Sequence, residues 1–169
     1  MSLVRLGGKP PGEETAASLL LDCHARIRSF AELAVRLAQE EAADAELADA
    51  AARVHRYFTQ ALPLHVADEE RSLAPRLRKL APHTAAALET MEREHRAHDQ
   101  LLARLIPAWD ALRSDPRLRR DTLADAVRLR ALLEEHLAAE ERLVIPALAQ
   151  LPAEEARAIV AELRARRTR

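Results

Sequence analysis

The strongest constraint on the fold is an internal repeat with an offset of 71 residues in a chain of 169. Residues 65–77 read HVADEERSLAPRL and residues 136–148 read HLAAEERLVIPAL, so that seven of the 13 positions are identical without a gap. The same offset relates His24 to His95. A long segment that recurs in this way indicates a duplicated structural unit. We therefore expect two similar halves related by a pseudo-twofold axis.

The composition indicates that both halves are helical. Alanine, leucine, arginine and glutamate dominate, and these residues are strong helix formers. Aromatic residues make up only 2% of the chain, and β-branched residues are few, which disfavours a β-sheet. We predict an all-α protein: an up-and-down, antiparallel four-helix bundle made of two pseudo-twofold-related helical hairpins, with a short C-terminal helix after it.

Prolines and turn residues mark the expected boundaries. Asp44 is the expected N-cap of the second helix, and Pro75 is expected to end or kink that helix. Kinks are expected at Pro63 and Pro107. Helices are expected over residues 13–41, 45–72, 83–113, from between 116 and 122 to 144, and 153–167. The expected organisation is an extended N-terminal segment, the bundle, and a short C-terminal helix with a basic tail, over residues 1–14, 15–150 and 151–169.

Four histidines are expected at one level of the bundle. The midpoint between His24 and His65 falls at the first expected hairpin turn, and the midpoint between His95 and His136 falls at the second. Residues equidistant from the turn of an antiparallel hairpin lie at the same height. At 1.5 Å per residue, this level is about 30 Å from both turns. Apolar residues recur at helical spacing around these histidines, so we expect their side chains to point inward.

Two glutamates complete this level. Glu69 and Glu140 each follow a histidine by four residues, which brings each pair to the same side of its helix. Buried carboxylates without partners are costly, and a bound metal removes that cost. Six ligands exceed the need of one tetrahedral zinc, so we predict two ions bridged by the two glutamates. The predicted metal ligands are His24, His65, Glu69, His95, His136 and Glu140.

This pattern resembles that of the hemerythrin-like, or HHE cation-binding, family over roughly residues 15–150. The similarity lies in one histidine in the first and third helices, a His-x-x-x-Glu element in the second and fourth, and the LAP and VIP segments that follow those elements. The resemblance implies a four-helix bundle with a non-haem di-iron centre, bridged by an oxo or hydroxo group and two carboxylates. Manganese or zinc are alternatives to iron.

One position departs from the oxygen-carrying members of that family. They have a second histidine four residues after the third-helix ligand, where this chain has Asp99, with His98 one residue earlier. The alternatives left open are a seventh ligand at His98, a seventh ligand at Asp99, or neither. The missing histidine disfavours reversible oxygen carriage. It fits better with the broader HHE group, and the resemblance to that group implies sensing or binding of dioxygen or nitric oxide, or the handling of iron.

Three functions are compatible with these residues. The leading one is a binding protein, not an enzyme, whose partner is a small diatomic ligand. The second is an enzyme, either a di-iron oxidase or peroxidase or one of the iron–sulfur repair type. Ferritin-like oxidases use Glu-x-x-His and more carboxylate, which disfavours them here. The third is a metal-free structural or interaction bundle.

The remaining features are less specific. A net charge of −1 gives no reason to expect a nucleic-acid or membrane partner, and a redox or protein partner is left open. Cys23 is the single cysteine, which with the lack of a secretory signal predicts a cytoplasmic protein. We expect Cys23 to be a small buried filler. Glu70 and Glu141 are expected to pair with Arg71 and Arg142 or with neighbouring helices.

Overall fold

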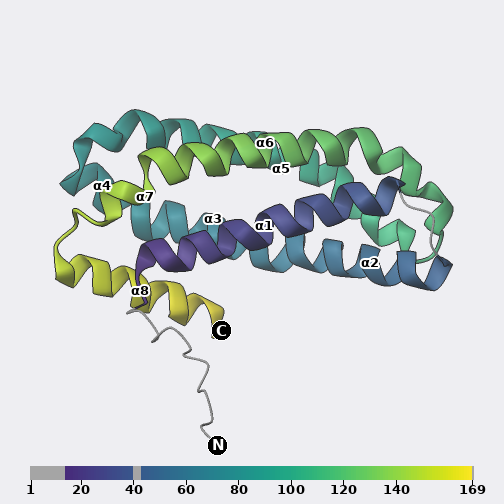
Figure 1. Cartoon of the computed structure of the whole chain (residues 1–169), viewed down its shortest axis with the longest axis horizontal. Helices are drawn as coiled ribbons and strands as arrows, with labels where there is room; N and C mark the ends of the chain where they lie inside the picture. Colours follow the sequence, from purple (N-terminus) through teal and green to yellow (C-terminus); the bar gives the residue numbers. More distant parts are fainter. Residues whose placement is uncertain (1–13, 40–42, 169) are drawn as a thin grey trace, which may run out of the picture.

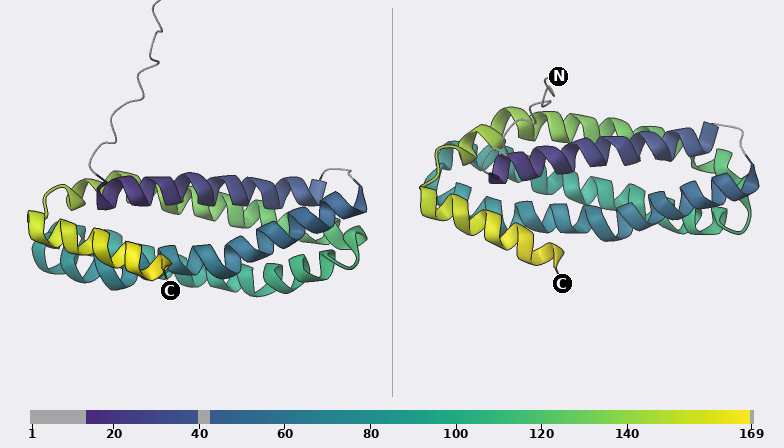
Figure 2. Two further views of the ribbon diagram at one scale, coloured as in Figure 1. Left: turned by 90° about the horizontal axis from the view of Figure 1, so that it is seen from below. Right: turned by 60° about the horizontal axis from the view of Figure 1, so that its bottom comes forward.

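The described residues form a bundle of four long, antiparallel helical segments (Figures 1 and 2). The structure is a computed structural model that describes residues 14–39 and 43–168, so the predicted N-terminal segment falls almost wholly outside the described residues. No strand occurs in the described part of the chain. The predicted all-α bundle with a short additional C-terminal helix is thus confirmed.

The first hairpin joins α1 (Ala16–Gln39) to a second helical segment that changes type along its length. That segment consists of α2 (Asp44–Arg56), η1 (Tyr57–Ala61), α3 (Leu62–Asp68), η2 (Glu69–Leu73) and α4 (Ala74–Leu80). Both η1 and η2 are π-helical, and each is followed by a helix with proline at its second position, Pro63 and Pro75. Proline has no N–H to donate, and the wider π-turn rearranges the hydrogen bonds around it.

Two expectations for this segment need correction. The helical segment continues past Pro75 to Leu80, so this proline does not end it. The distortion takes the form of the π-helical turn directly before the proline. Asp44 is the first residue of α2, and the N-cap is Ala43. The Asp44 carboxylate instead lies in the first turn, where it faces the positive end of the helix dipole.

The second hairpin repeats the topology with different details. It consists of η3 (Pro82–Thr84), α5 (Ala85–Leu112), η4 (Pro116–Thr122), α6 (Leu123–Leu143) and α7 (Ile145–Leu148). Here the turns at η3 and η4 are 3₁₀-helical, and Asp115 caps η4 by accepting a hydrogen bond from the Arg117 N–H at 3.2 Å. α5 remains helical through Pro107, and the kink expected there stays a prediction.

The C-terminal helix α8 (Ala153–Arg167) lies outside the four-helix arrangement and packs against α1, α3 and η2 (Figure 1). Its apolar side chains Ile159 and Leu163 are buried. Its last turn carries Arg166 and Arg167, which both pair with the fully buried carboxylate of Asp68. These two ion pairs join α8 to the last residue of α3, directly before η2.

The core consists of two apolar clusters with a polar layer between them. One cluster, which includes Ile27 and Leu102, extends toward the α1–α2 end of the bundle. The other, which includes Leu20 and Met91, lies at the α8 end. His24 follows Leu20 and precedes Ile27 on α1, so it falls between the two clusters. The polar layer is therefore enclosed by apolar side chains on both sides.

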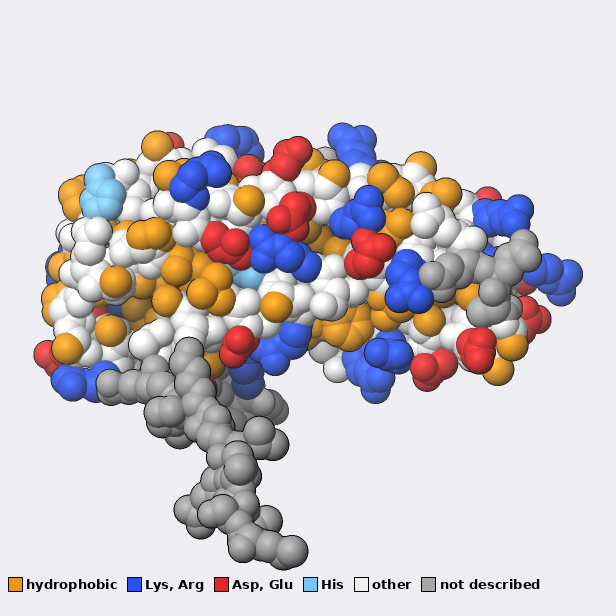
Figure 3. All heavy atoms as spheres, viewed as in Figure 1, with side chains coloured by type: hydrophobic (Ala, Val, Ile, Leu, Met, Phe, Trp, Pro, Cys, Tyr) orange, Lys and Arg blue, Asp and Glu red, His pale blue; other side chains and the backbone are white. Residues whose placement is uncertain are grey.

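The surface is charged but balanced. On the face shown in Figure 3, acidic and basic side chains alternate, with apolar side chains between them. Among the described helices, none has the length and apolar character needed to cross a membrane.

Candidate metal centre

The structure brings the six predicted ligands together as two overlapping groups. In each group, one candidate ligand atom from every residue lies within 4.8 Å of those of the others. The group that we call the first position consists of His24, His65, Glu69 and Glu140. The group that we call the second position consists of Glu69, His95, His136 and Glu140. The two glutamates thus belong to both positions, and all six side chains are buried.

Each glutamate lies between one histidine of the first position and one of the second. The Nε2–Oε distances are 2.8 Å for His65–Glu69, 3.1 Å for His95–Glu69, 3.3 Å for His24–Glu140 and 3.6 Å for His136–Glu140. For both carboxylates the two histidines face different oxygens of the same group. This is the arrangement that a bridging carboxylate requires.

The atoms that face the centre are unsatisfied. Both carboxylate oxygens of Glu69 and of Glu140, and Nε2 of three of the histidines, are buried without a hydrogen-bond partner of good geometry. Such groups are rare in folded proteins unless something else binds them. Metal ions bind imidazole nitrogen and carboxylate oxygen at about 2.0–2.2 Å, so two ligands of one ion lie at most about 4.4 Å apart. The four nitrogen–oxygen distances given above, from 2.8 to 3.6 Å, fall within this limit. The residues present therefore fit a pair of metal ions.

Carboxylates orient three of the four histidines from behind. In each case Nδ1 donates a hydrogen bond to a glutamate of another helix, which leaves Nε2 facing the centre. The pairs are His24–Glu141 at 2.9 Å, His95–Glu70 at 2.8 Å and His136–Glu94 at 2.8 Å. Glu70 and Glu141 therefore contact neighbouring helices, the second of the two arrangements expected for them. The role of Glu94 was missed in the sequence.

His65 has a different neighbour. Its Nδ1 is buried and has no hydrogen-bond partner of good geometry, and besides Glu69 the ring interacts with the thiol of Cys23 rather than with a second carboxylate behind it. Cys23 is buried, as expected for a filler, but its contact with His65 was not foreseen. Burial raises the pKa of this thiol, and the opposing effects of His65, Arg26 and Arg167 bring it down to about 7.

The ionisable side chains of this layer differ in the direction of their pKa shifts. Burial lowers the pKa of His65, but Glu69 outweighs burial and raises it well above its ordinary value. Burial also lowers the pKa of His95, and Glu69 again outweighs it and raises this pKa to about 9. The pKa of Glu69 lies below its usual range because these two histidines outweigh its burial. Burial and the charge of Glu69 raise the pKa of Glu140. Metal binding must therefore displace protons from the histidines.

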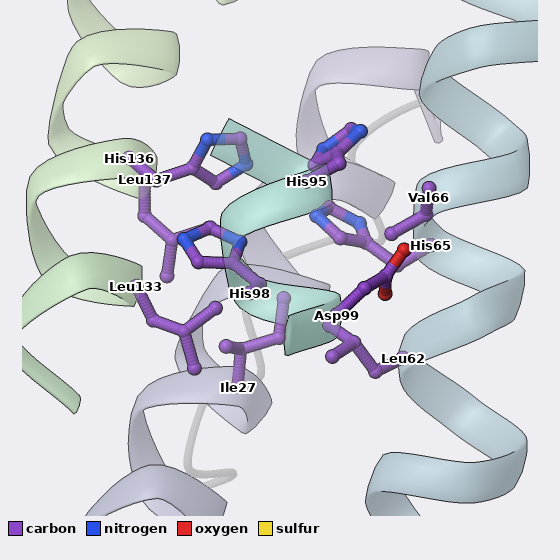
Figure 4. Close-up of a pocket in the computed structure, with 10 residues that line it drawn as sticks. All are labelled: Ile27, Leu62, His65, Val66, His95, His98, Asp99, Leu133, His136 and Leu137. Atoms are coloured by element: carbon purple, nitrogen blue, oxygen red, sulfur yellow. The ribbon is translucent and has the colours of Figure 1, made fainter. Parts of the chain in front are cut away.

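A small cavity borders both positions, because His65 of the first position and His95 and His136 of the second line it (Figure 4). Its volume is about 20 Å³, enough for about one water-sized molecule. It is lined by Ile27, Leu62, His65, Val66, His95, His98, Asp99, Leu133, His136 and Leu137. The ring of His98 is buried, and its centroid lies 5.0 Å from that of His136. Burial, then the charges of His136 and His95, lower the pKa of His98 to about 4, so this ring is neutral.

Neither His98 nor Asp99 belongs to the two groups of ligand atoms. Asp99 is exposed, and together with Leu62 and Val66 it also lines a groove of about 510 Å³ between α3 and α5. These three side chains therefore line both the groove and the small cavity. A second surface pocket, of about 250 Å³, lies between α5 and α6 and is bordered by Glu94 and Glu140.

Comparison with protein families gives one family. The model of the hemerythrin HHE cation-binding domain matches residues 15–148, which is most of the chain, and also residues 86–167. No individually curated protein matches the chain significantly.

Proposed function

The chain belongs to the hemerythrin HHE cation-binding domain family and is a metal-binding protein, and from this premise we propose that it holds a pair of non-haem iron ions at the first and second positions. In this proposal His24 and His65 bind one ion, and His95 and His136 bind the other. Each of the two glutamates, Glu69 and Glu140, would give one oxygen to each of the two ions.

The observation that carries this proposal is the sharing of two buried carboxylates between two histidine pairs. A single tetrahedral ion needs four ligands, and six protein donors that include two bridges suit two ions. The mixture of imidazole and carboxylate suits iron, and it also accepts manganese or zinc. The enclosing apolar clusters exclude water from these ligands.

We further propose that the ligand handled there is a small neutral molecule, dioxygen or nitric oxide. An iron pair supplies redox-active coordination positions for such a ligand. The chain supplies a cavity of about 20 Å³ with apolar walls and a neutral His98, which accommodates a diatomic molecule and disfavours a charged one. This supports binding or sensing more than catalysis on a larger substrate.

The test begins with metal content. Protein purified after iron-replete growth and aerobic reconstitution is expected to contain about two irons per chain. The reduced, anaerobic protein is then expected to change its visible absorption on addition of nitric oxide. A content of one ion per chain, or zinc alone, would contradict the iron pair. Sustained oxygen consumption with a reductant present would instead favour the oxidase alternative.

A further inference from the structure

The groups behind the four histidines follow the same repeat as the ligands. The offset of 71 residues relates Glu70 to Glu141, and these two carboxylates accept hydrogen bonds from His95 and His24. It likewise relates His65 to His136. Because Glu94 accepts the hydrogen bond of His136, the repeat predicts an equivalent carboxylate behind His65 at position 23. That position holds a cysteine.

The surroundings of Cys23 would suit a carboxylate. Its sulfur lies 3.5 Å from Nη2 of Arg26 and 3.6 Å from Nη2 of Arg167, and both groups are cationic donors. The His65 ring interacts with this thiol, and its Nδ1 is buried without a hydrogen-bond partner of good geometry. Donors thus converge on this position from α1, α3 and α8, and they meet a thiol, which is only a weak acceptor.

We propose that Cys23 is a positioning residue that makes the two metal positions unequal, because it replaces the carboxylate that would otherwise orient His65. This inference rests on the proposed function, since it requires the histidines to bind metal. A carboxylate behind a metal-binding histidine fixes the ring and makes its nitrogen a stronger donor to the metal. With a thiol there, the first position binds metal more weakly than the second and releases it first.

The test exchanges the two residues between the halves. Cys23→Glu supplies the missing carboxylate, Glu94→Cys removes its counterpart, and the double variant moves the asymmetry to the other half. Co²⁺ is the probe, because its visible absorption reports each binding step, and competition with a chelator gives the two affinities. Cys23→Ala is the control for lost packing.

In the unmodified protein we expect two Co²⁺ affinities, and loss of a carboxylate behind a ligand costs about 10–100-fold. Cys23→Glu should strengthen the weaker binding step by about tenfold, and Glu94→Cys should weaken the stronger step by at least that factor. Either change alone therefore narrows the difference between the two Co²⁺ affinities. The double variant should restore the difference between the two affinities, and Cys23→Ala should not narrow it, because alanine also supplies no carboxylate. To assign the steps, His136→Ala should remove the tight one.

Some outcomes would overturn the inference. Equal affinities in the unmodified protein would do so, as would a gap that neither exchange alters. If Cys23→Glu does not fold, judged by circular dichroism, Glu94→Cys alone decides, because it must make the two steps similar. Failure of the unmodified protein to bind two ions would instead contradict the proposed function, so the two failures can be told apart.

Discussion

The two metal positions have the same ligand types but different surroundings. The first position, on α1 and α3, lies on the side of the bundle that α8 covers, with the Cys23 thiol behind His65. The second position, on α5 and α6, has glutamates behind both of its own histidines and adjoins the surface pocket bordered by Glu94 and Glu140, whereas histidines of both positions line the small cavity. The same repeated motif therefore gives one position covered by α8 and one, the accessible position, beside a surface pocket.

The difference shows what the duplication preserves and what it leaves free to change. The spacing between ligands is common to both halves, and it sets where the nitrogen and oxygen atoms meet. The side chains one layer further out differ between the halves, and they determine access and metal affinity. The two positions should accordingly respond alike to changes in the shared glutamates and differently to changes in the outer layer.

The largest effect is expected from the residues that the two positions share. Glu69→Ala should lose most of both ions, because it removes an oxygen ligand from each position and leaves His65 and His95 without their common partner. His24→Ala or His136→Ala should lose most of one ion only. The measurement is iron per chain after aerobic reconstitution and gel filtration. Retention of one full ion by Glu69→Ala would contradict the bridge.

Metal removal should have the next largest effect. A ligand that binds only the folded state, present at about 1,000 times its Kd, stabilises that state by about 4 kcal/mol. For a domain of this size that corresponds to a Tm shift of about 8–16 °C. We expect a decrease of this order when the iron is chelated and its loss verified by metal analysis. Identical melting curves with and without metal would show that nothing binds at the buried layer.

The covering helix α8 offers a test of the first position alone. In the double variant Arg166→Ala, Arg167→Ala, the carboxylate of Asp68 stays buried without its partners. Breaking a buried ion pair costs about 3–5 kcal/mol, and we expect about 2–3 kcal/mol here because both arginines are partly exposed. Chemical denaturation of the metal-free protein measures this change in the free energy of unfolding.

The matched control is Arg164→Ala in the same helix. Arg164 is largely exposed and pairs with Glu14, so its loss should change the free energy of unfolding by less than about 0.5 kcal/mol. The double variant should also release the more weakly bound ion sooner, since Asp68 directly precedes Glu69 at the start of η2. Equal effects of the control and the double variant would show that α8 does not support the first position.

The convergence of the six candidate ligands was predictable because it depends only on regular geometry. A helix rises 1.5 Å per residue, so equal distances from one hairpin turn place His24 and His65 at one height, and the structure brings them to one group. Whether they bind metal stays a prediction. The outer partners were not predictable in this way. Which glutamate meets which histidine depends on the rotation of neighbouring helices, which a single helix does not reveal.

The repeat nevertheless contained a signal for the outer layer. Glu94 precedes His95 as Cys23 precedes His24, and this correspondence marks position 23 as the one that departs from the pattern. The prolines indicated distortions at Pro63 and Pro75 but not their π-helical form, and the packing of α8 had no comparable signal. That packing depends on arginines that meet a side chain distant in the sequence. Asp68, read as one residue of a repeated segment, gave no hint that two arginines enclose it.

The smallest effect is expected at the accessible position. His98→Leu should leave the iron content and the Tm nearly unchanged, because His98 lies outside both groups of ligand atoms. Its neutral ring lines the cavity beside His95 and His136, within reach of a molecule bound there. One hydrogen bond contributes about 0.5–1.5 kcal/mol, so the affinity of the reduced protein for nitric oxide should fall about two- to tenfold.

Asp99→Ala changes an exposed side chain at the edge of the cavity and should alter neither the iron content nor the affinity for nitric oxide. His95→Ala, in contrast, should lose most of one iron. If His98→Leu or Asp99→Ala removes iron as severely as His95→Ala, that residue is a seventh ligand of the second position.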